Sequence, residues 1–257
     1  MNTASVGVKQ LCRLLAAILM LALAQPLLAR TAADDPHWSL GAIAISGSAF
    51  RHDVDDTLLL VPALGYEGRT VFLRGLVAGL RARPDPAVDM QLRLQPRMDR
   101  LHASDAPALA GIETRRRSVE AVGAVSVGPR WLRTHLSAGV DLLDRHGGTF
   151  AEFRVSAPVW IAGTIVSVDV AAVWQSASLN RYYHGVSDAE ARPGRPAYRP
   201  GAGLAPRAGV RLIRPFADHW QLNVIARQTW LDSNVRSSPL VDRSSSWSAL
   251  LGISRRF

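Results

Sequence analysis

The sequence predicts an all-β fold, an antiparallel transmembrane β-barrel of about 10–12 strands preceded by a cleaved signal peptide. Three observations predict it: an export signal, long segments whose apolar residues recur at every second position, and connections that alternate between short and long. The hydrophobic content of 48% excludes a disordered chain, and the single cysteine, Cys12, excludes a disulfide scaffold. The formal net charge of +9 calls for an anionic partner or an internal use of arginine.

The start of the chain has the organisation of a secretory signal. Lys9 and Arg13 precede an apolar run, Leu14–Ala24, which is too short to cross a bilayer because a helix needs ~20 residues for ~30 Å. We expect cleavage after Ala29, which gives a signal peptide over 1–29 and a barrel over 30–257. An exported barrel in the cell outer membrane has no access to nucleic acid, so none is expected as a partner.

Alternation identifies the strands. In Val88–Arg97 the even positions are apolar and the odd ones polar, which is the pattern of a strand with one face in lipid and one in water. A soluble secreted sandwich is the alternative, but its strands average ~5–6 residues, shorter than these segments. The expected strands lie near 38–49, 57–66, 70–81, 87–97, 118–127, 134–144, 149–159, 164–176, 205–214, 219–231 and 246–257.

That set has an odd number of strands, whereas bacterial single-chain barrels have an even number. One segment is therefore miscounted, and we expect the fault before residue 82, where 51–56 is an unclear connection. A barrel of 10 or of 12 strands is left open, and we prefer 12.

The connections and the aromatic residues give the barrel two distinct ends. The links at Gly128–Trp131, Trp160–Gly163 and Pro215–Asp218 are tight, while 98–117, 176–204 and 232–246 are long and polar. Short periplasmic turns and long outer loops are typical of outer-membrane barrels. Two interfacial belts of aromatic residues follow, with Trp131, Trp160, Phe216 and Trp220 at the short-turn end and Trp174, Trp230 and Trp247 at the long-loop end.

Two groups of residues are candidates for function. The first is a set of charged side chains expected to line the lumen: Asp89, Arg93, Arg97, Glu120, Asp141, Asp169 and Arg227. We favour a lumen that these side chains fill over an open channel. The second belongs to the loop 179–203, which either caps the barrel or binds an anionic or sugar partner: Arg181, Tyr182, Tyr183, His184, Arg195, Tyr198 and Arg199. The run Arg115–Arg117 is expected to contact lipopolysaccharide phosphate at the outer surface, among outer-membrane lipid.

Catalytic chemistry is not expected. His135 and Ser137 share a face, but that face is the lumen at the periplasmic end, where a lipid hydrolase would not place its nucleophile and base. No G-x-S-x-G or His-Glu-x-x-His motif is present, so we expect no enzyme, no metal and no cofactor.

The long loop carries a specific resemblance. Its segments Tyr182–Ser187, Glu190-Ala191 and Arg195–Gly203 resemble the hallmark region of the MipA/OmpV family of outer-membrane proteins. Further matching features are Pro62, Tyr66–Gly68, Asp141, His146-Gly147, Ser238–Val241 and the terminal Phe257, which resembles the signal read by the outer-membrane assembly machinery.

The resemblance implies a barrel that serves as a scaffold between a murein lytic transglycosylase and a penicillin-binding protein; other members are adhesins. Two function classes are therefore kept, a scaffold or adhesin and a narrow pore for small solutes. Continuity of the lumen discriminates them, because only a pore needs a water path past the inward arginines.

Overall fold

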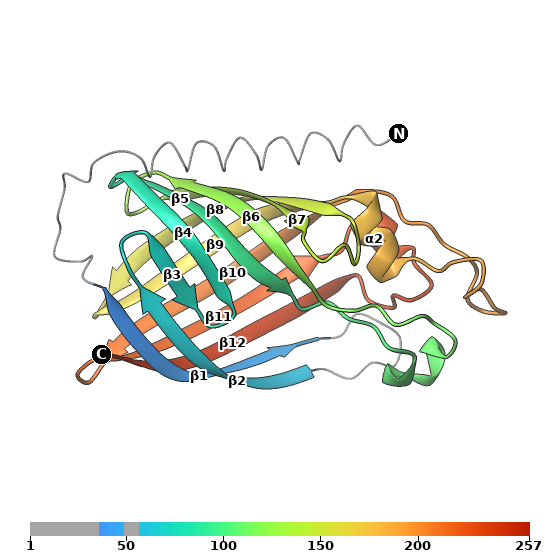
Figure 1. Ribbon diagram of the computed structural model, residues 1–257, viewed down its shortest axis with the longest axis horizontal. Helices are drawn as coiled ribbons and strands as arrows, with labels where there is room; N and C mark the ends of the chain where they lie inside the picture. Colours follow the sequence, from blue (N-terminus) through green and yellow to red (C-terminus); the bar gives the residue numbers. More distant parts are fainter. Residues whose placement is uncertain (1–35, 49–56) are drawn as a thin grey trace.

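The computed structural model describes residues 36–48 and 57–257, and within them twelve strands form one closed antiparallel barrel (Figure 1). Each strand pairs with its sequence neighbours, and β1 closes the ring against β12. The strands are β1 His37–Gly47, β2 Thr57–Glu67, β3 Val71–Arg74, β4 Val77–Asp85, β5 Val88–Arg97, β6 Ser118–Val127, β7 Arg133–Asp141, β8 Thr149–Ile161, β9 Thr164–Gln175, β10 Gly203–Phe216, β11 Trp220–Trp230 and β12 Ser245–Arg256. The expected signal peptide and the connection at 51–56 lie outside the described residues.

The even count comes from a hairpin that the sequence pattern had merged into one strand. The segment expected over 70–81 is two strands, β3 and β4, joined at Gly75 and Leu76. Gly75 has a φ of +60°, which glycine adopts without strain, and its N–H donates to the Leu64 carbonyl at 2.9 Å. The preferred count of 12 is confirmed, and the miscounted segment is this one.

One strand also ends earlier than the sequence predicts, because a side chain binds the backbone that follows it. The strand expected over 134–144 ends at Asp141, because that carboxylate accepts the N–H groups of Leu143, His146 and Gly147 at 3.1, 2.7 and 3.1 Å. These bonds fold 142–148 into a tight loop and stop the ladder.

The register separates a lipid face from a lumen face. Large apolar residues of one parity stay exposed on the outside, for example Leu60 at 71%, Val170 at 62% and Leu251 at 53%. Residues of the other parity face the interior, where Glu120 is 1% exposed. None of the helices in the described residues is long and apolar enough to cross a membrane.

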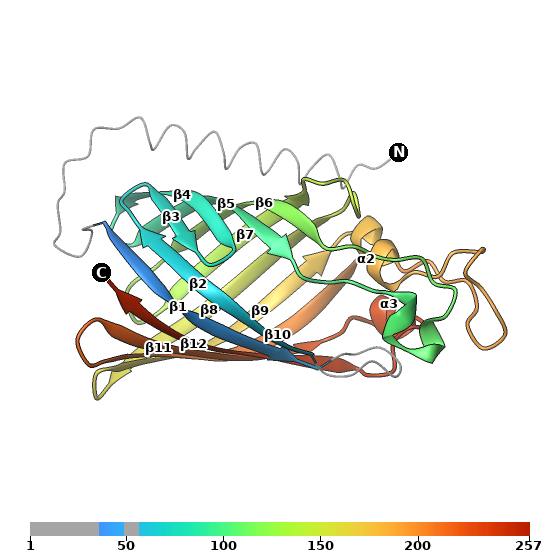
Figure 2. The ribbon, with the colours of Figure 1, turned by 60° about the horizontal axis from the view of Figure 1, so that its bottom comes forward.

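The two ends of the barrel differ as expected. The turns at 86–87, 128–132, 162–163 and 217–219 lie at the end that holds the C-terminus, and the long connections lie at the other end with helices α2 (Ala177–His184) and α3 (Ser233–Arg236) (Figures 1 and 2). Two short 3₁₀ helices, η2 (Ala103–Asp105) and η3 (Pro107–Leu109), lie in the loop after β5. The Phe257 N–H donates to the Trp38 carbonyl at 2.9 Å, which ties the last residue to the first strand.

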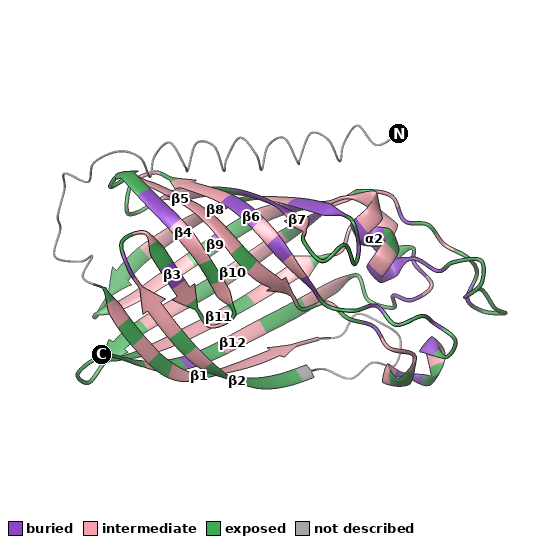
Figure 3. Ribbon diagram, viewed as in Figure 1, coloured by how far each residue is buried: buried purple, intermediate pink, exposed green. Residues whose placement is uncertain are grey.

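Packing inside the barrel is uneven. Buried positions gather on β4–β7 and around α2, whereas no described residue of β1 or β2 has a buried side chain (Figure 3). Ser176 caps the start of α2, because its Oγ accepts the Leu179 N–H at 3.4 Å. The core that this helix forms inside the outer mouth contains Val122, Phe150, Leu179 and Tyr183.

The assignment of faces predicts a contrast between two neighbours on β7. Leu136→Arg places a charge on the lipid face, where it costs about 2–4 kcal/mol near the midplane. Ser137→Arg places the same charge in the lumen, where the register sets it beside Glu152. We expect reversible unfolding in lipid to show the larger loss of free energy for Leu136→Arg, and equal losses would contradict the assignment.

Candidate functional site

The lumen carries ion pairs near its outer mouth. Arg97 Nε lies 2.5 Å from a Glu120 carboxylate oxygen, and Arg97 Nη1 lies 2.9 Å from Asp99. Glu120 also accepts Gln95 Nε2 at 3.2 Å, so this buried carboxylate is fully paired. Such an arrangement binds the β5 and β6 walls together more than it offers a free charge to a solute.

A buried histidine completes this cluster. His146 Nε2 lies 3.7 Å from Asp141 and 3.8 Å from Glu120, and the side chain is fully buried. Burial lowers the pKa of His146, and the charge of Arg97 lowers it further, against the opposing pull of Asp141. We infer a neutral imidazole at pH 7 that serves the packing of the 142–148 loop.

The middle of the lumen has more cations than carboxylates. Glu152 pairs with both Arg207 at 2.8 Å and Arg154 at 3.4 Å. Arg93 bonds only the neutral Gln91 and Gln95, at 3.3 and 3.1 Å, and Arg211 bonds only Asn223 at 3.3 Å. Within the described residues Arg93, Arg211 and Arg227 have no carboxylate within 4.0 Å, so this zone has a positive field.

Asp89 and His135 lie nearer the short-turn end, whereas Asp169 lies in the middle of β9, across Gly209 from Arg227. Asp89 pairs with Arg83 at 2.9 Å, and Asp169 faces Gly209 and Ser156 across the register. His135 contacts Ser126 Oγ at 2.6 Å and Ser156 Oγ at 3.0 Å, and bonds neither Ser137 nor a carboxylate. All seven predicted lumen residues therefore share the inner face, but they do not form one cluster.

The long loops form a second, outer core over the barrel. Leu101, Leu109, Ile112, Val186 and Leu240 pack together, drawn from three separate loops. Arg115 crosses this core and binds Glu190 with contacts of 2.6 and 2.9 Å. Arg115 is therefore buried, which corrects its expected place at the lipid surface; Arg116 and Arg117 of the run are exposed.

Most of the predicted loop residues serve this cap. Arg195 is buried and donates to the carbonyls of Ala108, Ala110 and Glu190 at 2.8–3.0 Å. Burial raises the pKa of Tyr183, and its hydroxyl donates to the Arg116 carbonyl at 3.1 Å. The Tyr182 hydroxyl accepts the Arg116 N–H at 2.9 Å, the Tyr198 hydroxyl donates to Asn234 at 2.8 Å, and His184 is buried.

Only two members of the loop set face solvent, Arg181 and Arg199. Arg199 pairs with exposed Asp188 at 2.7 Å. The geometry therefore favours the capping role over a ligand-binding surface for this loop.

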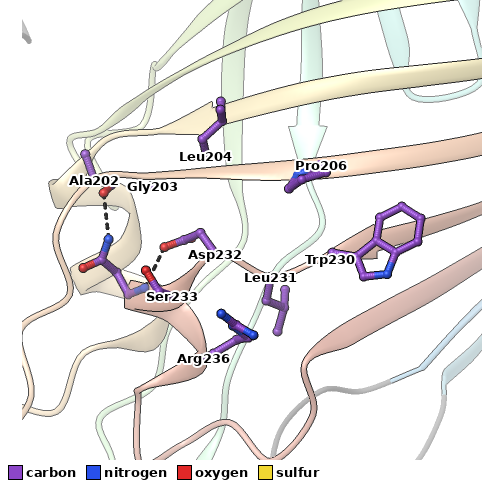
Figure 4. Close-up of a pocket in the computed structure, with 10 residues that line it drawn as sticks. Ala202, Gly203, Leu204, Pro206, Trp230, Leu231, Asp232, Ser233 and Arg236 are labelled. Atoms are coloured by element: carbon purple, nitrogen blue, oxygen red, sulfur yellow. Dashed lines mark hydrogen bonds between the residues drawn. The ribbon is translucent and has the colours of Figure 1, made fainter.

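A shallow depression of about 520 Å³ lies beside the cap, between β10, β11 and α3 (Figure 4). Asp232 lines it but is occupied, because its carboxylate accepts the Asn234 N–H at 2.8 Å. No group of three or more metal-ligating side chains occurs in the described part of the chain.

Four further arginines face the lumen and were not among the predicted residues, although alternation along β3, β8 and β10 marks them: Arg74, Arg154, Arg207 and Arg211. The pairing of Arg115 with Glu190 had no such signal, because 75 residues separate the partners.

The Glu190 carboxylate predicts an acid-sensitive cap. Burial would raise its pKa, but the N–H groups of Ser187 and Glu113 and the charge of Arg115 outweigh burial and hold the pKa below its usual 4.5. This contribution to cap stability is complete above the pKa of an unfolded glutamate and is lost as the pH falls through the lower folded value.

We expect Glu190→Gln to raise amide hydrogen exchange across 186–198 at pH 7, since breaking a buried pair costs about 3–5 kcal/mol. Asp188→Asn, which breaks the exposed pair with Arg199, is the matched control and is expected to change little. Unchanged exchange in Glu190→Gln would show that the pair does not hold the cap.

Comparison with known proteins identifies the family of this chain. Residues 40–257 match the family described as MltA-interacting protein MipA. The putative outer membrane protein YiaT of Escherichia coli K12 is 23% identical over 85% of this chain and 90% of its own length, and the MltA-interacting protein of the same strain is 28% identical over 80% and 84%.

Among solved structures, the translocator domain of the autotransporter NalP from Neisseria meningitidis is similar with a TM-score of 0.45 and 10% identity, covering 100% of this chain and 98% of its own. The barrel and the named relatives both show an outer-membrane protein. The chain belongs to this MipA family of outer-membrane proteins, as its resemblance to MipA/OmpV proteins implies.

Proposed function

We propose that this protein is a non-catalytic interaction platform in the outer membrane that binds a murein lytic transglycosylase and, alongside it, a penicillin-binding protein. The carrying observation is the charge of the short-turn rim. Exposed arginines gather there on β4, on β12 and on separate turns, namely Arg69, Arg83, Arg130, Arg255 and Arg256, of which Arg83 is paired with Asp89. In this orientation the rim faces the periplasm, where murein enzymes work, while the opposite mouth is covered by the cap.

The relative named MltA-interacting protein supports this assignment. A basic rim suits a partner with an acidic surface, since charge complementarity raises the association rate and fixes orientation. The short turns offer little area, so a modest affinity that depends on salt is expected.

The proposal predicts a charge-dependent contact at one end of the barrel. Arg69→Glu combined with Arg130→Glu is expected to weaken binding of a purified lytic transglycosylase roughly tenfold, mainly through the association rate. Surface plasmon resonance on the barrel in nanodiscs measures this.

Arg199→Glu, at the outer end, is the matched control. Equal losses from both variants, or no binding of either murein enzyme to the folded barrel, would reject the platform.

A second candidate, a narrow pore for small anionic solutes, is favoured by Arg93, Arg211 and Arg227, which have no carboxylate within 4.0 Å in the described part of the chain. Planar-bilayer recording would then give stable steps with anion preference, and Arg93→Gln with Arg227→Gln would reduce that preference. Arg214→Gln, on the outer face of β10, is the control. A folded barrel that stays silent would reject the pore and leave the platform untouched.

A further inference from the structure

The barrel wall is incomplete on one side. The β3–β4 hairpin is short, and β2 pairs with β3 only through Gly65, Tyr66 and Glu67 (Figures 1 and 2). Above that hairpin, the side of β2 over Leu58–Leu64 that faces away from β1 has no strand partner in the described structure; we call it the free edge. Across the gap, β5 pairs with β4 only up to Leu94, so Gln95–Arg97 bond β6 alone.

A proline lies on each of the two strands that border this gap, Pro62 on β2 and Pro96 on β5. In an antiparallel strand the N–H and C=O of alternate residues point to opposite sides, and the Leu64 carbonyl points to the gap side because it accepts the Gly75 N–H. Pro62, two residues earlier, points the same way. On β5 the Leu92 carbonyl faces β4, since it lies 2.6 Å from where a Cβ on Gly79 would be, so Pro96 also faces the gap.

The prolines indicate that the gap is a permanent feature and not a site for another strand. Proline has no N–H to donate, and it blocks strand addition at an edge. The free edge still exposes carbonyl groups, which cannot face lipid without a polar partner. The gap must therefore admit water or a ligand from the lumen.

An apolar path runs along the lumen wall from the gap. The register aligns Leu59, Ile45, Leu250 and Ile225 in one row across β2, β1, β12 and β11, and we call these the apolar row. Leu59 is 36% exposed although it faces inward, so the row borders open space. Ile43 and Leu250 approach each other over Gly252, where a Cβ would lie 3.4 and 3.7 Å from them.

The row ends on a cation. Its next member on β10 is Arg211, and Arg227 lies two residues from Ile225 on β11. Four strand spacings separate Leu59 from Arg211, roughly 19 Å along the wall at ~4.8 Å each. That length is comparable with one leaflet of hydrocarbon, about 15 Å thick. Neither arginine has a carboxylate within 4.0 Å in the described residues. Asp169 and Arg227 approach Gly209 from either side, so the site sets two guanidinium groups against one nearby carboxylate and keeps a net positive charge for an anion.

We propose that the lumen binds a single-chain anionic amphiphile, with its headgroup on Arg211 and Arg227 and its tail along the apolar row, reaching the membrane through the gap above the β3–β4 hairpin. The charge and the apolar residues each select one half of such a molecule. This site is separate from the platform at the short-turn rim, so either proposal can fail without the other.

Photo-crosslinking tests the proposal by comparing neighbouring residues that face the lumen and the lipid. The probe is a long-chain carboxylate with a diazirine in its tail, added to the folded barrel in nanodiscs, and the labelled residues are identified by mass spectrometry. We expect labels on the lumen face at Leu59, Ile45 and Leu250, in addition to the lipid face at Leu58 and Leu60 that any membrane-dissolved probe would reach. Labels on the lipid face alone would overturn the proposal.

Variants separate the headgroup from the route. Arg211→Gln with Arg227→Gln is expected to reduce lumen labelling roughly tenfold, the effect of losing a hydrogen bond between charged groups. Arg214→Gln, which removes the same charge from the outer face of β10, is expected to leave it unchanged.

Val61→Trp, at the lumen side of the gap, is expected to reduce labelling of Leu250, whereas Leu60→Trp on the lipid side is not. Heat-modifiable gel mobility confirms that each variant is folded. Undiminished labelling in the double arginine variant, or equal competition by an uncharged long-chain alcohol, would overturn the anionic preference. Dimers joined through β2 would instead show that another chain covers the gap.

Discussion

Hydrogen bonding of the backbone within lipid is the constraint on which the rest of this structure depends. A strand that crosses the membrane must bond both neighbours, so β1 closes on β12 and the sheet has no end. Closure fixes the alternation, which leaves Val170 and Leu251 in lipid and collects the arginines in the lumen. Among the described strands the wall departs from this rule beside the short β3–β4 hairpin, and there Pro62 and Pro96 remove two of the N–H donors that would otherwise be unpaired.

The charged side chains inside the barrel fall into two groups, one paired and buried and one without carboxylate partners among the described residues. Near the outer mouth, Arg97, Glu120 and the Arg115–Glu190 pair are buried and matched, so they stabilise the wall and the cap. In the middle, Arg93, Arg211 and Arg227 face the lumen with no carboxylate within 4.0 Å among the residues that the structure describes, so this zone keeps a net positive charge. The capped mouth and the positive lumen therefore keep the proposed protein contact at the short-turn rim apart from the proposed ligand site in the lumen.

Much of the fold could be predicted from the sequence, because the period of two in segments such as Val88–Arg97 is imposed by the contrast between lipid and water. The β3–β4 hairpin was missed because Gly75 and Leu76 form a turn without any polar run to mark it. Capping by the loop 179–203 was one of two expectations, but its contacts could not be predicted, since Arg115 and Glu190 are distant in sequence. Tyr183 and Arg195 look like ligand-binding residues until their buried contacts are known. The family resemblance located the loop correctly without indicating that its residues pack inward.

Residue-resolved amide exchange on β2, with the refolded protein in nanodiscs, tests the central claim of a barrel closed everywhere except at one built gap. The account predicts alternation between adjacent residues: the amides of Leu59 and Val61, bonded to β1, are protected, while those of Leu58 and Leu60 on the free edge exchange rapidly. Uniform protection along β2 would contradict it, because a partner would then cover the edge and the wall would have no opening.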